Sequence, residues 1–182
     1  MIFYIYIYMN NQELNHIIFC YGSNMCEYEM LKYSNRLKNN KTNHFELLDI
    51  GVLDNYKFVY RNICLPTSNP KIKSAKATII PNKKTHVYGS IVKLSNELFN
   101  LIVKKEGIHK NYYIMKMLKI KSLISNATYD ATVFIMNKNV SSNRCNLNIS
   151  KYPSKKYENK IVKSAQFYNF PQTYINKYLI SK

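Results

Sequence analysis

An apolar run that ends at a short polar turn is the feature that most constrains the fold of this chain. Residues 17–21 are apolar or aromatic, as in a buried strand, and Gly22-Ser23-Asn24 follows them directly. From Met25 onward, apolar residues recur at helical spacing. A strand, a tight turn and a helix in this order leave backbone N–H groups free at the start of the helix, where a carboxylate binds favourably. On spacing alone, Ser23 or Asn24 could instead simply cap the helix.

The rest of the chain alternates between strand-like and helix-like segments. Strand-like runs occur at 16–21, 56–63, 75–80, 86–94, 112–121 and 129–136. Helical periodicity occurs at about 25–38, 95–105, 155–168 and 171–180. We therefore expect an α+β fold, a small mixed β-barrel of about six strands with peripheral helices.

Length and composition indicate one domain. The chain has 182 residues, is 46% hydrophobic, and contains only 4 glycines and 5 prolines, so no linker is evident. We expect the domain to cover residues 13–182 and residues 1–12 to be a flexible or adventitious extension, with an extra edge strand as the alternative. The apolar stretch 1–9 is too short to span a bilayer and lacks the features of a signal peptide. We therefore expect a cytoplasmic protein with no membrane partner.

The charge and the cysteines permit other functions that we consider weaker. A net charge of +17 is compatible with nucleic-acid binding, but the lysines cluster only at 71–84 and 151–163 and no nucleic-acid-binding motif accompanies them. The cysteines have no zinc-ligand spacing, and free thiols fit a reducing compartment. A cysteine nucleophile beside the turn, at Cys20 or Cys26, is a further alternative. We expect no metal.

Several ordered motifs resemble those of the γ-glutamylcyclotransferase family, also called AIG2-like. Residues 21–25, Tyr-Gly-Ser-Asn-Met, are similar to the family's Tyr-Gly-Ser-Asn-Leu signature, and residues 87–94 resemble its Val-Trp-Gly strand. Glu106-Gly107-Ile108 and then Tyr113 follow in the family's order. The resemblance extends over residues 16–180 and implies the same small barrel. Two departures are Lys73-Ser74-Ala75-Lys76, where the family has a glycine-containing stretch, and Val103, where an Asp is usual.

The resemblance implies an intramolecular aminolysis that releases 5-oxoproline and a free amino acid from a γ-glutamyl substrate. This chemistry needs no cofactor, and one carboxylate can move both protons. The resemblance assigns that role to Glu106 and substrate binding to Tyr21, Gly22, Ser23, Asn24, Met25, Tyr113 and Tyr157. We expect a small-molecule partner and a monomer or homodimer.

The alternatives for this site are a catalytically silent pocket and a Glu106 that is only a surface carboxylate before a helix-ending glycine. Helical spacing suggests that Lys104 and Lys105 need not point into the cavity. The acidic residues that we consider as competitors for the role lie in stretches that read as exposed helix or loop: Glu27, Glu29, Glu46, Asp49, Asp54, Glu97, Asp130 and Glu158.

Overall fold

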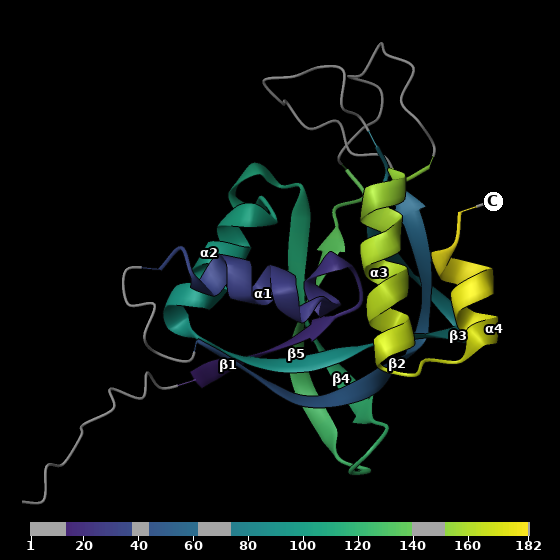
Figure 1. The fold of residues 1–182 in the computed structure, drawn as a ribbon, viewed down its shortest axis with the longest axis horizontal. Coiled ribbons are helices and arrows are strands. Elements are labelled where there is room, and N and C mark those ends of the chain that lie inside the picture. The colour runs from purple at the N-terminus through teal and green to yellow at the C-terminus, as the bar shows by residue number, and fades with distance from the viewer. Residues whose placement is uncertain (1–13, 38–43, 62–73, 140–151, 182) are drawn as a thin grey trace, which may run out of the picture.

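Five strands close into one mixed barrel in the computed structural model, which describes residues 14–37, 44–61, 74–139 and 152–181. The strands are β1 (Leu14–Cys20), β2 (Phe45–Arg61), β3 (Lys76–Ser95), β4 (Tyr113–Ser122) and β5 (Thr128–Met136). Their order around the barrel is β1-β3-β2-β4-β5 (Figure 1). β1 and β5 run parallel and close the barrel, whereas the other neighbours are antiparallel. The expected α+β barrel is confirmed; the expectation for residues 1–12 lies outside the described residues.

The count of five strands differs from the expected six because two predicted strands are one. The segments 75–80 and 86–94 both belong to β3, which pairs with β2 on both sides of a short irregular stretch. Between them the register jumps, so that Asp54 pairs with His86 but Tyr56 pairs with Pro81. A proline followed by polar residues normally marks the end of a strand, which is why the sequence pattern indicates a break here. β2 also begins at Phe45, well before the expected start at residue 56.

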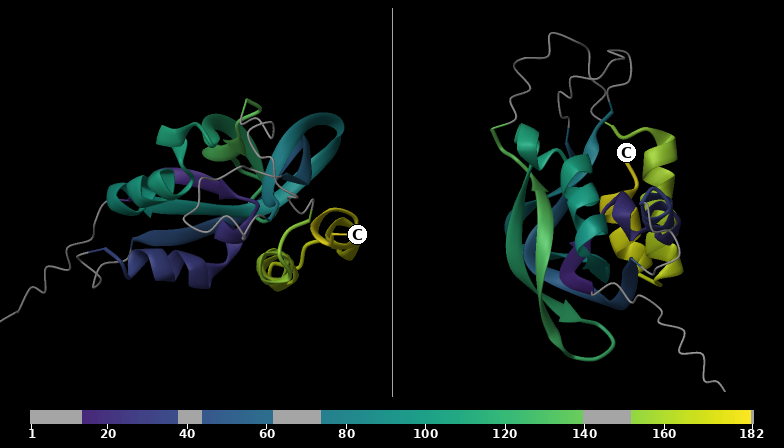
Figure 2. Two further views of the ribbon diagram at one scale, coloured as in Figure 1. Left: turned by 90° about the horizontal axis from the view of Figure 1, so that it is seen from above. Right: turned by 90° about the vertical axis from the view of Figure 1, so that its left-hand side faces the viewer.

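Short helices surround the barrel. They are the 3₁₀ turn η1 (Ser23–Met25), α1 (Glu27–Ser34), α2 (Asn96–Lys105), the 3₁₀ turn η2 (Ile108–Lys110), α3 (Lys155–Phe167), α4 (Gln172–Tyr174) and the π-helical turn η4 (Ile175–Leu179). Serine side chains cap two of them: Ser95 accepts from the N–H of Leu98, and Ser154 accepts from the N–H of Tyr157. In the right panel of Figure 2, α1, α3 and α4 lie on one side of the barrel and the β4–β5 hairpin lies on the other. Among the described residues, no helix combines the length and apolarity needed to cross a membrane.

The barrel is filled by apolar side chains from every strand. Fully buried examples are Ile18, Phe58, Ile91, Ile120 and Val133, one from each strand in turn. Burying a side chain of this size contributes about 1.5–3 kcal/mol, so the interior is the main source of stability. The rigid barrel fixes the ends of β1, β3 and β4, and these ends carry the site described below.

Three carboxylates that the sequence pattern placed on the surface are buried instead. Glu29 and Glu158 lie on the inner faces of α1 and α3, and Asp49 lies within β2. Asp49 accepts hydrogen bonds from the Ser122 hydroxyl at 2.5 Å and the Ser125 hydroxyl at 2.9 Å. Partners of this kind compensate for the loss of water around a buried charge, and they come from distant parts of the chain.

Candidate active site

A cavity of ≈ 200 Å³ opens where the ends of β1, β3, β4, α2 and α3 meet. Its walls are mainly aromatic, with two lysines and one carboxylate among them. The lining residues are Phe19, Cys20, Tyr21, Gly22, Ser23, Asn24, Lys76, Ala77, Lys105, Glu106, Tyr112, Tyr113, Phe134 and Tyr157. All the predicted site residues except Met25 are therefore brought together around one cavity. Apolar walls with a few convergent polar groups are typical of small-molecule sites.

The turn after β1 forms one wall of this cavity. The N–H of Met25 donates to the Gly22 carbonyl at 3.0 Å, and that of Cys26 donates to the Ser23 carbonyl at 3.2 Å. The N–H groups of Ser23 and Asn24 have no hydrogen-bond partner within the part of the chain that the structure describes. Met25 does not line the cavity: its N–H is used inside the turn and its side chain is buried in the core, and its assignment to substrate binding stays a prediction.

Gly22 is needed for close approach rather than for an unusual backbone angle. Its φ is −113°, outside the left-handed region in which glycine is favoured. A Cβ at this position would lie 3.3 Å from the Ala77 Cβ and 3.8 Å from the Tyr157 hydroxyl. The absence of a side chain therefore lets the turn lie against β3 and α3.

Glu106 occupies the opposite wall, at the C-terminal end of α2. Its N–H donates to the Ile102 carbonyl at 2.8 Å, which fixes its backbone to the helix. The next residue, Gly107, has a φ of 67°, the left-handed conformation in which glycine commonly ends helices. The Glu106 side chain is 16% exposed and lines the cavity. The helix end therefore holds a carboxylate in a fixed position facing the turn.

A side-chain cluster connects the two walls. The Asn24 amide nitrogen donates to Glu106 Oε1 at 3.1 Å, and the Lys105 ammonium donates to the Asn24 amide oxygen at 2.6 Å. Lys105 Nζ also lies 3.6 Å from Glu106 Oε1. Asn24 therefore orients the carboxylate and receives its own orientation from Lys105.

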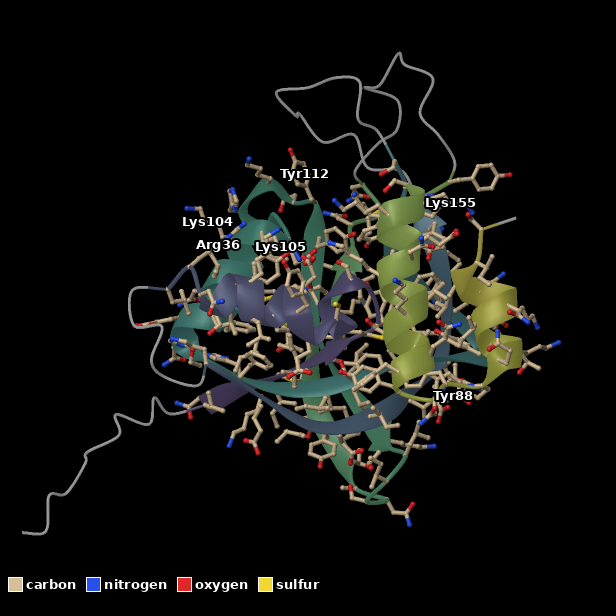
Figure 3. The ribbon with its side chains drawn as sticks, in the orientation of Figure 1. Arg36, Tyr88, Lys104, Lys105, Tyr112 and Lys155 are labelled. Carbon is tan, nitrogen blue, oxygen red and sulfur yellow. The ribbon has the colours of Figure 1, made fainter. Side chains whose placement is uncertain are left out.

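The position of Lys105 differs from the sequence expectation. In Figure 3, Lys104 lies on the outer side of α2, whereas Lys105 lies toward the centre of the molecule. The Lys105 ammonium lies 4.4 Å from the centre of the Tyr33 ring, a cation–π contact with α1. The Tyr33 hydroxyl donates to Glu29 at 3.4 Å, and Lys160 of α3 forms an ion pair with the same carboxylate. The contacts with the Tyr33 ring of α1 and with Asn24 of the turn thus hold Lys105 in the site.

Three tyrosines in the cavity wall keep their protons. Burial raises the pKa of Tyr21 and Tyr113 well above the ordinary value, and the charge of Glu106 adds to this effect. Burial also raises the pKa of Tyr157 to about 12. The Tyr21 hydroxyl donates to the Phe134 carbonyl, and that of Tyr113 donates to the Ala77 carbonyl at 3.1 Å.

The Tyr157 hydroxyl differs from the other two because it accepts a hydrogen bond, from the N–H of Ala77 at 3.3 Å. Its own proton can therefore be donated to a ligand. Tyr21 and Tyr113, in contrast, use their protons to join strands of the barrel.

The structure argues against a cysteine nucleophile. Cys20 lines the cavity, but burial raises the pKa of its thiol to about 12, so the reactive thiolate is not formed near neutral pH. Cys26 does not line the cavity. Nowhere in the described ranges do three or more His, Cys, Asp or Glu side chains gather closely enough to hold a metal ion. The expectation of chemistry without a metal or cofactor stays a prediction.

The sequence analysis did not identify Lys76 and Tyr112, which both line the cavity. Lys76 begins β3 beside Ala77, and Tyr112 precedes Tyr113. The only sequence feature that distinguishes Lys76 from the other lysines is its position in residues 73–76, which depart from the family pattern. Nothing in the sequence distinguishes Tyr112 from the other tyrosines, of which the chain has 17.

The fold agrees with the comparisons with known proteins. The model of the AIG2-like family matches residues 86–178, and the chain belongs to this family. The match begins in β3 and includes α2, Glu106 and α3. A comparison with curated protein sequences gives no match.

Solved structures share the fold at low sequence identity. A γ-glutamyl cyclotransferase is similar with a TM-score of 0.67 and 17% identity, over 89% of this chain and 85% of the other. A human protein, described as uncharacterized protein loc79017, gives a TM-score of 0.65 and 20% identity, over 91% and 86%. YkqA from Bacillus subtilis gives 0.62 and 14%, over 89% of this chain and 52% of its own. At these identities the likeness establishes the fold, and function has to be argued from the site.

Proposed function

We propose that this protein is a γ-glutamylcyclotransferase that releases 5-oxoproline and a free amino acid from γ-glutamyl substrates. It would act in the cytoplasm, as a monomer or homodimer, without a metal or organic cofactor. The observation that supports this most is the Glu106 carboxylate, which Asn24 holds at 3.1 Å across a small cavity. Membership of the AIG2-like family and the fold shared with a solved γ-glutamyl cyclotransferase point the same way.

The reaction joins the two ends of the glutamyl group. The α-amino nitrogen of the substrate, as the free base, attacks the γ-carbonyl carbon and forms the new C–N bond of the five-membered ring. The C–N bond to the leaving amine then breaks. The attacking nitrogen loses one proton and the leaving nitrogen gains one, and Glu106 accepts the first and supplies the second.

The cavity supplies the other requirements of this chemistry. The free N–H groups of Ser23 and Asn24 can bind the substrate α-carboxylate or the developing negative charge on the γ-carbonyl oxygen. Tyr157 can donate its proton to a substrate oxygen, since its raised pKa keeps it protonated. A closely fitting pocket also holds the flexible glutamyl chain in a ring-forming pose, which lowers the entropic part of the barrier.

A catalytically silent binding protein is the second candidate, and the position of Lys105 favours it. The Lys105 ammonium, 3.6 Å from Glu106, competes with the substrate amine for the carboxylate. A silent member would bind a γ-glutamyl ligand through the same turn and release no product. Nucleic-acid binding rests on the net charge of +17 alone.

The test is release of 5-oxoproline from γ-glutamyl-alanine and from glutathione by the purified protein. Glu106→Gln keeps the size of the side chain and should abolish release. Glu46→Gln is the matched control, because Glu46 is exposed on β2 and does not line the cavity. No release by the wild-type protein would refute the proposed activity. Binding of γ-glutamyl-alanine without release would then favour the catalytically silent binding protein. Salt-dependent RNA binding, with no binding of γ-glutamyl-alanine, would favour a nucleic-acid-binding protein.

A further inference from the structure

Lys76 is a cavity residue whose ammonium forms no ion pair among the described residues. It is the first residue of β3 and lies beside Ala77, whose backbone contacts Tyr113 and Tyr157. Its ammonium lies 4.6 Å from the centre of the Tyr157 ring. Lys76 forms no ion pair with any carboxylate of the described residues. The chain has 10 acidic residues, and all except Glu13 lie in the described part, so few carboxylates remain that could pair with it.

The surroundings of Lys76 are unfavourable for an unpaired cation. Burial lowers the pKa of its ammonium, and the positive charges of Lys105 and Lys160 lower it further, while the charge of Glu106 offsets only part of this effect. The Tyr157 ring offers only partial compensation. A bound anion would relieve this cost, because a charge-assisted hydrogen bond is about twice as strong as a neutral one.

Lys105 has a different role from Lys76. It is already fixed by the Asn24 amide oxygen at 2.6 Å, by Glu106 and by the Tyr33 ring. Lys76 has no such hydrogen bonds among the described residues and contacts the ring of Tyr157. Lys76 is therefore the cation in the cavity that is available for a ligand.

The charges of the cavity match one class of γ-glutamyl compound. Lys76, Lys105 and Glu106 give two positive charges and one negative charge in its lining. A γ-glutamyl-α-amino acid has the complementary set, namely two carboxylates and one ammonium group. The ammonium group belongs at Glu106 in the proposed reaction, and its nitrogen attacks once it has lost a proton to solvent. Its neighbouring carboxylate belongs at the turn, next to Lys105, which leaves the carboxylate of the leaving amino acid for Lys76.

We propose that Lys76 is a specificity residue that binds a carboxylate on the carbon next to the leaving nitrogen. The site then takes γ-glutamyl-α-amino acids in preference to γ-glutamyl amines, which lack this group, and to ε-lysine amides, which carry it several bonds away. This inference rests on the proposed function. It assigns a substrate class through a residue that lies in the stretch where the chain departs from its family's pattern.

The test compares two substrates that differ by one carboxylate, γ-glutamyl-alanine and γ-glutamyl-ethylamine. For the wild-type protein, kcat/KM for 5-oxoproline release should favour γ-glutamyl-alanine by about 10- to 100-fold. Lys76→Met keeps the aliphatic stem and removes the charge, so it should lower kcat/KM for γ-glutamyl-alanine by about the same factor. Its kcat/KM for γ-glutamyl-ethylamine should stay within about 3-fold of the wild-type value, because that substrate has no carboxylate to lose. Lys76→Arg should retain most of the preference.

Lys83→Met is the matched control, because Lys83 lies on the same strand, is exposed and does not line the cavity. It should leave both substrates unaffected. Melting temperatures of all variants show whether Lys76→Met is folded, and Lys76→Arg provides the second test if it is not. Equal use of the two substrates by the wild-type protein, or an unchanged preference in folded Lys76→Met, would overturn the inference and leave the proposed function intact. Release from glutathione but from neither of these substrates would overturn only the inference, and absence of 5-oxoproline from all three would overturn the two together.

Discussion

Glu106 and Glu158 are both shielded carboxylates close to lysines, but their surroundings differ. Glu158 on α3 has a side chain only 4% exposed, and it accepts from the Lys155 ammonium at 3.0 Å, from the Ser181 N–H at 2.7 Å and from the Ser181 hydroxyl. Glu106 is 16% exposed and accepts one amide hydrogen bond at 3.1 Å, with Lys105 at 3.6 Å. An ionised carboxylate has about four acceptor positions. Glu158 has filled most of them with protein donors, whereas Glu106 keeps positions for a substrate.

This difference separates a structural carboxylate from a reactive one. Glu158 joins α3 to Ser181, the residue before the last one of the sequence, so its partners stabilise the packing of this segment on α3. Glu106 faces the cavity, and its partner Asn24 belongs to the turn that forms the opposite wall. Saturated hydrogen bonding favours stability, and incomplete hydrogen bonding beside a cavity favours function.

The largest expected effect is on catalysis, and it follows from replacing Glu106, the reactive carboxylate of this comparison. Glu106→Gln should lower 5-oxoproline release by about 10²- to 10⁴-fold, the usual contribution of a general acid–base group. Its melting temperature should change little, because the carboxylate makes few contacts that stabilise the fold. Activity and thermal unfolding should be measured on the same preparation. A large loss of melting temperature with activity retained would place Glu106 in the structural class.

The next effect concerns the residue that orients Glu106. Asn24→Ala removes a hydrogen bond to a charged group and should lower kcat/KM by about 10- to 100-fold. Asn35→Ala serves as its control, since Asn35 is exposed at the end of α1 and does not line the cavity. Steady-state kinetics on γ-glutamyl-alanine measure the change. Equal activity of the two variants would mean that Glu106 needs no orienting partner.

Glu158→Ala should affect stability rather than chemistry. It leaves the Ser181 donors without their acceptor and should lower the free energy of unfolding by about 1–3 kcal/mol. For a chain of this length, each kcal/mol corresponds to about 2–4 °C in melting temperature. Glu46→Ala, at an exposed position on β2, is the comparison variant and should melt near the wild-type temperature. If both variants melt together, the Glu158 contacts contribute nothing to stability.

The smallest expected effect is the dependence of the free energy of unfolding on pH. Burial acts to raise the pKa of Glu158, but Ser181 and Lys155 outweigh it, so the pKa in the folded protein lies below the ordinary value of 4.5. Burial also acts to raise the pKa of Glu29, but the hydrogen bond and the charge of Lys160 outweigh burial. The pKa of Glu29 in the folded protein therefore also lies below 4.5. As the pH falls, the unfolded chain therefore takes up these protons before the folded protein does. The stabilisation that the two groups contribute above pH 4.5 is lost as the pH falls through their lower pKa values in the folded protein.

Each such group can contribute a slope of at most about 1.4 kcal/mol per pH unit. Urea unfolding at a series of pH values below neutrality measures the slope. Glu158→Gln removes one of the two groups, so its stability should fall less steeply with acid than that of the wild-type protein. Identical slopes would show that the Glu158 carboxylate has the same pKa in both states.

Much of the candidate site could be predicted from the sequence, because its residues lie in short local motifs. The turn at Gly22 to Asn24 interrupts a buried strand, and Glu106 precedes a glycine that ends a helix. Together with Tyr113 and Tyr157, these motifs occur in an order that resembles the γ-glutamylcyclotransferase family, and the family model matches residues 86–178. The sequence alone could not show that two of the six expected strands form one strand, because Pro81 and the polar residues after it resemble a strand end.

The sequence by itself determined most of the local elements, the family, and the motifs that place Gly22, Glu106, Tyr113 and Tyr157 around the cavity. Only the tertiary structure decided that Lys105 enters the site, that Lys76 lies in the wall without an ion pair to any described carboxylate, and that Met25 does not line the cavity. The physical reason is distance along the chain. Periodicity and turn chemistry act over a few residues, whereas the Asn24–Glu106 hydrogen bond joins positions 82 residues apart. The direction of a lysine and the burial of a carboxylate depend on such long-range partners, which exist only once the barrel has closed.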